Sequence, residues 1–325
     1  MKDFSLLATL QPAMPHFKRF ANDERLSGIR LNNPRWTPAE LETTLADPTV
    51  QNAQVPIYFD VKGWQLRVTE VHPSDAYLDL TINHPIQVET PSEVFLKAGA
   101  DRALLERIEE GGRRLIFRGG PKYLVYPGES LQIRHPSLTV LGDQFCADEI
   151  EKIKVAKRLG ITRYFLSYAE SSADVQRLRD LVGPDYEIMV KIENEKGLRY
   201  ASTEFKKVPN LRLVAARGDL YVEIKRPHLI LNALRTIIER DPEACVGSRL
   251  MLSTITSDVP SCADFCELAW LYDIGYRSFL LCDELCLKEE LLAVAVNACQ
   301  AFRTDYQEPQ KAPHSTWLGR LLRRA

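Results

Sequence analysis

The chain has 325 residues and a formal net charge of -2, with 45% hydrophobic and 26% charged residues. These are ordinary globular values, and a charge so near zero gives no general attraction to nucleic acid or to membrane surfaces. No stretch reaches the roughly 18 apolar residues of a membrane span. We therefore predict a soluble, cytoplasmic protein with no nucleic-acid or membrane partner.

Two pairs among the seven cysteines have the i, i+4 spacing of one helix face: Cys262 with Cys266, and Cys282 with Cys286. Either pair could face a metal ion from the side of a helix. Free thiols in a reducing compartment are more often small buried hydrophobic groups, and we expect that role here.

Short apolar runs alternate with amphipathic segments, most clearly in the second half of the chain. This alternation is typical of βαβ units with a parallel sheet. Strands are predicted at residues 5–10, 28–31, 57–60, 164–167, 187–192, 211–215, 249–252 and 278–281. Helices are predicted at residues 148–159, 173–181, 228–239 and 263–272. Eight strands arranged in this way predict an α/β fold, the (β/α)₈ TIM barrel.

Residues 68–136 interrupt this rhythm. They hold alternating patterns, such as Tyr77-Leu-Asp-Leu-Thr-Ile, and turn residues, such as Gly119-Gly-Pro. The segment is predicted to be a small, mostly β, lid-like domain inserted after the third strand. The first part of the barrel then covers residues 1–67, the rest of the barrel covers 137–303, and 304–325 form a linker and C-terminal tail.

Polar residues follow two neighbouring strands of the predicted barrel. Lys191 and Glu193 alternate by two, which places both side chains on one face at the barrel mouth. Gly218 and Asp219 follow the next strand at a helix start, where free backbone N–H groups can hold a carboxylate or phosphate. Two carboxylates are typical of a Mg²⁺ site, and a lysine beside it can stabilise an enolate or a transferring phosphoryl group.

Several motifs, in order along the chain, resemble those of the pyruvate kinase family. The two central ones are Lys191-Ile-Glu-Asn-Glu-Lys-Gly and Ala216-Arg-Gly-Asp-Leu-Tyr-Val-Glu-Ile, and the others are Ala8-Thr-Leu-Gln-Pro-Ala, Ile29-Arg-Leu-Asn, Asp60-Val-Lys-Gly-Trp-Gln-Leu-Arg, Ser171-Ser-Ala-Asp-Val and Met251-Leu. The similarity covers roughly residues 5–67 and 138–300. The inserted segment of this chain has no recognisable similarity to the family's lid domain. No part of this sequence resembles the family's C-terminal regulatory domain.

The resemblance implies a role for each residue of the catalytic centre. Glu193 and Asp219 would bind Mg²⁺ or Mn²⁺, and Lys191 would stabilise the phosphoryl group in flight. Arg30 would contact the transferred phosphate, and Arg67 would support the site electrostatically.

The resemblance also implies substrate and cation contacts. The backbone amides of Gly218 and Asp219 would hold a pyruvate-like carboxylate, and Lys62 would contact phosphate. Arg249 aligns with the family's active-site threonine and is assigned to the substrate pocket. Asn32 and Asp60 match two of the family's monovalent-cation ligands.

The chain departs from the family pattern around that monovalent site. Pro34 and Val61 replace two residues that supply side-chain oxygens, and Gln65 replaces the glutamate linked to K⁺ dependence. We therefore do not expect K⁺ to be required. Tyr221 replaces a glycine beside the substrate pocket, which would narrow it.

Three functions fit this pattern. The first is pyruvate kinase-like, divalent-metal-dependent phosphoryl transfer between phosphoenolpyruvate, or a related enol phosphate, and a nucleotide. The second is a metal-dependent aldolase or lyase that uses a pyruvate enolate, and the third is a keto-acid-binding sensor without turnover. The presence of Arg30 and Lys62, which phosphate handling needs, favours the first. The expected assembly is a homodimer or a monomer.

Overall fold

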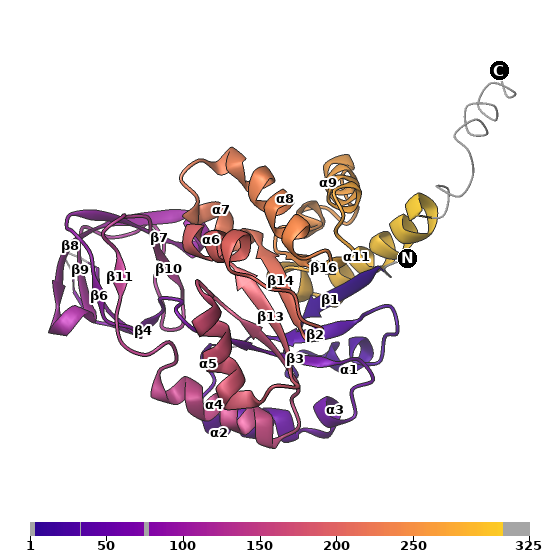
Figure 1. The fold of residues 1–325 in the computed structure, drawn as a ribbon, viewed down its shortest axis with the longest axis horizontal. Coiled ribbons are helices and arrows are strands. Elements are labelled where there is room, and N and C mark those ends of the chain that lie inside the picture. Colours follow the sequence, from indigo (N-terminus) through magenta and orange to yellow (C-terminus); the bar gives the residue numbers. More distant parts are fainter. Residues whose placement is uncertain (1–3, 33, 75–77, 308–325) are drawn as a thin grey trace, which may run out of the picture.

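The computed structural model describes residues 4–32, 34–74 and 78–307. Eight parallel strands close into a barrel in the order β1-β16-β15-β14-β13-β12-β3-β2 (Figure 1). The strands are β1 (Ser5–Thr9), β2 (Gly28–Leu31), β3 (Ile57–Val61), β12 (Arg163–Leu166), β13 (Glu187–Ile192), β14 (Leu211–Ala216), β15 (Cys245–Gly247) and β16 (Ser278–Leu280). The predicted TIM barrel is confirmed.

Helices surround the barrel and bury its outer surface. They are α1 (Phe17–Phe20), α2 (Pro38–Ala46), α3 (Pro48–Gln51), α4 (Ala147–Arg158), α5 (Ser172–Val182), α6 (Glu195–Thr203), α7 (Arg217–Glu223), α8 (Ile230–Arg240), α9 (Cys262–Asp273), α10 (Asp283–Cys286) and α11 (Glu289–Phe302). The barrel interior is filled by one buried side chain from each of seven strands: Leu7, Tyr58, Phe165, Met189, Val214, Cys245 and Leu280. This layer closes the barrel below its mouth, so polar side chains can gather only above it.

The seventh strand lies earlier than predicted. Residues 249–252 were expected to form it, but the strand is β15, Cys245–Gly247, and the chain turns directly after it. Ser248, Arg249 and Met251 have φ angles of 65°, 60° and 54°, a left-handed backbone that no strand adopts. The run that predicted a strand is a turn in which only Leu250 and Met251 are buried, and the real strand has three residues.

The inserted segment forms an antiparallel sheet of six strands in the order β10-β7-β8-β9-β5-β4, with a two-stranded sheet of β11 and β6 (Figure 1). The strands are β4 (Val68–Val71), β5 (Asp79–Ile82), β6 (Ile86–Gln87), β7 (Ser92–Leu96), β8 (Asp101–Glu109), β9 (Arg114–Arg118), β10 (Leu131–Ile133) and β11 (Thr139–Val140). A separate apolar cluster, which includes Leu80, Leu105 and Phe117, holds it together. Strand pairing therefore continues to Val140.

Polar contacts on two sides help fix this sheet to the barrel. His84 Nε2 donates to the carbonyl oxygen of Gly63, just after β3, at 2.9 Å. Gly63 has a φ of 53°, and a Cβ there would lie 2.7 Å from the carbonyl oxygen of Ser167, so only glycine fits. On the other side, Gln132 of β10 donates to Asp219 of α7 at 2.7 Å.

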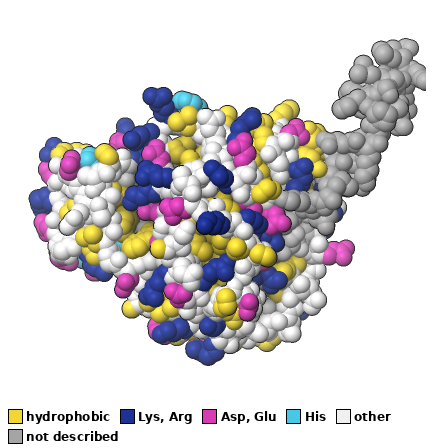
Figure 2. All heavy atoms as spheres, viewed as in Figure 1, with side chains coloured by type: hydrophobic (Ala, Val, Ile, Leu, Met, Phe, Trp, Pro, Cys, Tyr) yellow, Lys and Arg dark blue, Asp and Glu magenta, His cyan; other side chains and the backbone are white. Residues whose placement is uncertain are grey.

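Across the described ranges, no helix is both long and apolar enough to cross a membrane. Basic and acidic side chains are interspersed on the face shown in Figure 2, without a single large field of one sign. The predicted tail lies largely outside the described residues, from residue 308 onward.

Candidate active site

Lys191 lies within β13, near its carboxyl end, and is 6% exposed. Its Nζ is 2.9 Å from Glu193 Oε1, 2.9 Å from Ser167 Oγ and 3.4 Å from Asp60 Oδ2. The ammonium group therefore lies among the ends of three neighbouring strands, β3, β12 and β13. This is the mouth of the barrel, where barrel enzymes place their reacting groups.

Asp60, at the end of β3, is the centre of a buried cationic cluster. Arg30 Nε donates to Asp60 Oδ2 at 2.6 Å, and Lys62 Nζ donates to Asp60 Oδ1 at 2.9 Å. Burial by itself would raise the pKa of Asp60, but Arg30, Lys191 and Lys62 hold that pKa well below its usual range. The carboxylate thus stays charged and keeps three cations in place at the mouth.

The remaining donors of Arg30 are largely engaged as well. Its Nη1 donates to Asp283 Oδ1, at the start of α10, at 3.0 Å and to Thr9 Oγ1 at 3.3 Å. The pKa of Arg30 is raised because Asp60 and Asp283 outweigh the effect of its burial. The guanidinium group is therefore rigidly held, with its charge facing the cluster.

Glu193 and Asp219 lie beside this cluster, Glu193 directly after β13 and Asp219 in the first turn of α7, which follows β14. Glu193 is 1% exposed and accepts from the backbone N–H of Tyr168 at 2.7 Å. Asp219 accepts from the Tyr168 hydroxyl at 3.3 Å, so one residue touches both carboxylates. Burial raises the pKa of Glu193 to about 7, the charge of Asp219 reinforces the shift, and Lys191 opposes it.

This arrangement fits a divalent cation. Two carboxylates that repel each other would be stabilised by a cation between them, and oxygen donors are what Mg²⁺ and Mn²⁺ accept. Glu193 Oε1 is buried and makes no hydrogen bond apart from its ion-pair contact with Lys191. Within the described ranges, no three His, Cys, Asp or Glu side chains form a metal-holding group. An ion here would therefore take its other ligands from water or substrate.

Asn32 and Asp60, the two predicted monovalent-cation ligands, both accept hydrogen bonds from Lys62. Lys62 Nζ donates to Asn32 Oδ1 and to Asp60 Oδ1. Its ammonium group thus lies between the two oxygens that the resemblance assigned to K⁺. Burial lowers the pKa of Lys62 to about 7, against the pull of Asp60. Lys62 lies inside this cluster at 8% exposure.

The other predicted residues are placed around this centre. Arg67 is half-buried and bonds Gln65 and the carbonyl of Gly128 in the inserted segment. Arg249 lies in the turn after β15, with its guanidinium 4.9 Å from the centre of the Tyr221 ring. Gly218 is in the first turn of α7, and a Cβ on it would lie 3.3 Å from Ser248 Oγ. Ser248, rather than Arg249, is the first residue after β15 and offers a hydroxyl beside Gly218.

Arg217 fixes the start of α7 and the turn after β15 together. It donates to the carbonyl oxygen of Ser248 at 2.6 Å and to Glu267 of α9 at 2.6 Å, and it is buried. The Gly218–Asp219 backbone is thereby positioned against β15.

Sequence reasoning missed Tyr168, Ser167, Gln132 and Ser248. Ser167 and Tyr168 directly follow β12, so the rule applied to the ends of the fifth and sixth strands could have found them. Tyr168 has a φ of 50°, an uncommon conformation for a bulky residue and frequent at functional sites. Gln132 had no signal, because the inserted segment matches no motif.

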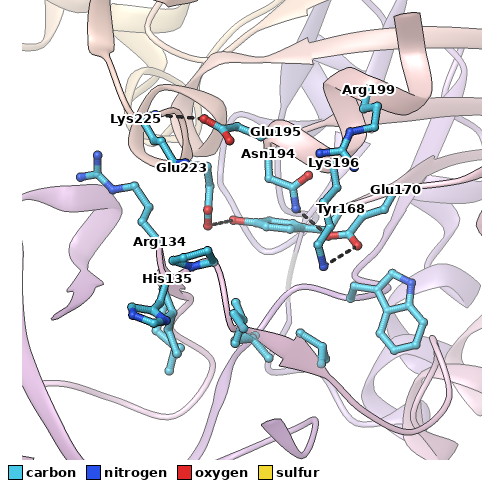
Figure 3. Close-up of a pocket in the computed structure, with 17 residues that line it drawn as sticks. Arg134, His135, Tyr168, Glu170, Asn194, Glu195, Lys196, Arg199, Glu223 and Lys225 are labelled. Carbon is cyan, nitrogen blue, oxygen red and sulfur yellow. Dashed lines mark hydrogen bonds and ion pairs between the residues drawn. The ribbon is translucent and has the colours of Figure 1, made fainter. Parts of the chain in front are cut away.

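A cleft of about 300 Å³ lies beside the centre, between the inserted sheet and helices α6 and α7 (Figure 3). Tyr168, which contacts Glu193 and Asp219, also lines this cleft, and its hydroxyl is 3.4 Å from Oε1 of Glu223, another lining residue. Arg134, Lys196 and Arg199 are among its basic lining residues. Lys191, Glu193 and Asp219 do not line it, so the cleft is separate from the proposed metal centre.

In comparisons with known proteins, three curated relatives of this chain are all pyruvate kinases. No family model matches the chain. Pyruvate kinase from Dictyostelium discoideum is 22% identical over 246 residues, which cover 66% of this chain and 48% of that protein. Pyruvate kinase from Encephalitozoon cuniculi (strain GB-M1) is 28% identical over 182 residues, 51% of this chain and 38% of that protein. Pyruvate kinase from Agaricus bisporus is 32% identical over 84 residues, which cover 25% of this chain and 15% of that protein.

The chain is a divergent relative of the pyruvate kinases. The predicted family relationship is confirmed, while the chain spans about half or less of the length of these relatives. The pyruvate kinase relationship agrees with a closed barrel interrupted by a β segment after its third strand.

Proposed function

We propose that this chain is a pyruvate kinase-like, divalent-metal-dependent phosphotransferase acting between phosphoenolpyruvate, or a related enol phosphate, and a nucleotide. The observation that carries the proposal is the grouping of Lys191, Arg30 and Lys62 around Asp60, next to Glu193, which is linked through Tyr168 to Asp219. Phosphoryl transfer needs a positive site for the moving group and a cation that neutralises its oxygens, and little covalent chemistry from the protein.

Each residue of the centre has a role in this proposal. Glu193 and Asp219 would hold Mg²⁺ or Mn²⁺, which when bound supplies charge neutralisation for the phosphoryl oxygens. The Lys191 ammonium, fixed by Ser167 and Glu193, would stabilise charge that grows in the transition state. Arg30 would face the transferred phosphate, and the half-buried Arg67 would add positive charge from the side of the inserted segment.

The start of α7 would hold the other end of the substrate. The Gly218 and Asp219 amides would bind a pyruvate-like carboxylate, because helix N-termini present free N–H donors. The Ser248 hydroxyl, next to Gly218, would take the substrate-facing position that the resemblance gave to Arg249. Arg249, stacked on Tyr221, would border the same pocket.

One observation favours a second candidate. Arg30 is already bonded to Asp60, Asp283 and Thr9, so much of its donor capacity is used within the protein. An enzyme that forms a pyruvate enolate, such as an aldolase or lyase, needs the metal and Lys191 but no free arginine for a transferred phosphate.

The test is a pair of assays on the same preparation with Mg²⁺ and with Mn²⁺. Transfer of phosphate from phosphoenolpyruvate to a panel of nucleoside diphosphates is expected. Exchange of pyruvate methyl protons with deuterium reports enolisation alone. Exchange without any phosphate transfer would favour the lyase candidate, and the absence of both would remove the enzyme proposal.

A further inference from the structure

Two of the seven cysteines contradict the expectation of buried thiols. Cys262 and Cys266 are exposed, at the first and fifth residues of α9, while Cys282 and Cys286 are buried as expected. The Sγ atoms of Cys262 and Cys266 are 3.8 Å apart. An i, i+4 spacing places both on one face of the helix, so their separation is set by the helix itself.

This separation matches that of two thiolates on a tetrahedral soft cation. Zn–S bonds are about 2.3 Å, and at a tetrahedral angle two such sulfurs lie roughly 3.8 Å apart. The pair therefore needs no backbone movement to chelate one ion. In the described part of the chain, neither sulfur has another hydrogen-bonding partner, so neither thiol is committed to a structural role.

The turn that carries the pair is held firmly. Ser261 caps the helix by accepting from the N–H of Asp264, and Asp264 in return accepts from the Ser261 N–H at 2.8 Å. Asp264 also accepts from the hydroxyl of Ser253, which ties α9 to the loop after β15. The geometry of the pair is therefore set before any ion binds, while the hydrogen bond with Cys262 raises the pKa of the Cys266 thiol, a shift that a bound cation would oppose.

We propose that Cys262 and Cys266 form a bidentate dithiolate site for a thiophilic divalent cation, of which Zn²⁺ is the biological example. Binding replaces two S–H protons with two metal–sulfur bonds and releases both protons to solvent. Water or a small solution ligand completes the coordination shell. The site is independent of the proposed phosphotransferase centre, whose donors are oxygens.

Cd²⁺ is a suitable probe, because its thiolate complexes absorb in the ultraviolet and its carboxylate complexes do not. Titration of the whole chain with Cd²⁺ in excess Mg²⁺ is expected to give the thiolate band and saturate at one ion per chain. Zn²⁺ should displace the probe, and Mg²⁺ should not. Cys262→Ser and Cys266→Ser should each weaken binding by about 10²-fold, since each loses the second arm of a chelate.

Cys146→Ser is the matched control, because Cys146 is a half-buried, single thiol, and it should bind as the wild type does. The proposal is overturned if the wild type shows no thiolate band at one equivalent, or if both serine variants keep wild-type affinity. Saturation at one ion per two chains would also overturn it, in favour of a site shared between two copies.

Discussion

At the scale of single residues, the charge of the barrel mouth is organised by Asp60. This carboxylate contacts Arg30, Lys62 and Lys191, which come from β2, the loop after β3, and β13. Three buried cations would repel one another without it, and buried charges persist only when paired. The charge balance at the mouth therefore joins residues from three separate motifs of the sequence.

Lys191→Met tests the residue on which the enzyme proposal depends most. The variant should fold and bind metal but lose turnover by ~10²–10³-fold, because a preorganised positive group no longer faces the transition state. Steady-state kinetics and circular dichroism check this. Lys154→Met is the control, since its side chain is exposed on α4 and, among the described residues, forms an ion pair with Glu151 at the surface, so its turnover should be unchanged. A folded Lys191→Met protein with wild-type turnover would sink the mechanism.

Lys62 gives a second prediction, on monovalent cations. Its ammonium group bonds both Asn32 and Asp60, the two matched cation ligands, and Pro34 and Val61 offer no side-chain oxygen. Activity in saturating Mg²⁺ should therefore be equal in K⁺, Na⁺ and tetramethylammonium salts at fixed ionic strength. Saturable activation by K⁺ alone would contradict it.

At the scale of elements, polar contacts fix the inserted sheet to the barrel. Gln132, in β10, donates a hydrogen bond to Asp219. His84, which follows β5, donates one to the carbonyl oxygen of Gly63. His84 also lies against the Trp64 ring, with ring centres 5.6 Å apart. Its burial lowers its pKa from the ordinary 6.5, so the attachment favours the neutral imidazole.

The stability of this attachment should depend on pH. Because the pKa of His84 is lower in the folded state, the unfolded chain binds more protons, and stability is lost as pH falls below 6.5. His84→Gln keeps an N–H donor for Gly63 but does not titrate. Urea unfolding of both proteins above and below pH 6.5 should show that the free energy of unfolding falls more on acidification in the wild type than in His84→Gln. Equal losses would mean that His84 does not control the attachment.

At the scale of the whole molecule, two apolar cores lie in one chain. The barrel cluster and the cluster of the inserted sheet are separate, and the latter includes Leu80, Leu105 and Phe117. Two separate cores can unfold locally and independently of each other. Separate cores would also allow an inserted domain to move relative to the barrel mouth.

Leu105→Ala and Leu213→Ala compare the two cores. Both leucines are fully buried, and each substitution should cost about 2–5 kcal/mol through lost burial and a cavity. Hydrogen exchange should show that Leu105→Ala loses protection mainly within residues 68–140, whereas Leu213→Ala loses protection across the barrel strands. Uniform loss in both variants would show a single cooperative unit instead.

The assembly of the chain stays a prediction. A homodimer or a monomer is expected, and light scattering of the 325-residue chain is the direct measurement. A stable tetramer would contradict it.

The sequence by itself determined the barrel, the insertion point and most of the polar residues at the strand ends. The alternation of strands and helices is local, and Lys191, Glu193 and Asp219 stand in short motifs beside clear apolar runs. The alternation and the motifs can both be recognised without knowledge of the fold, because each depends only on residues that are close together in the sequence.

Only the tertiary structure decided where the seventh strand lies and what completes the mouth. A three-residue strand such as Cys245–Gly247 is too short to show a period, and it forms because β14 and β16 pair with it on both sides. Tyr168, Gln132 and Ser248 join the centre through contacts between distant segments, which no local pattern encodes. The exposure of Cys262 and Cys266 was decided in the same way, because helical spacing fixes their common face but not whether that face meets the barrel or solvent.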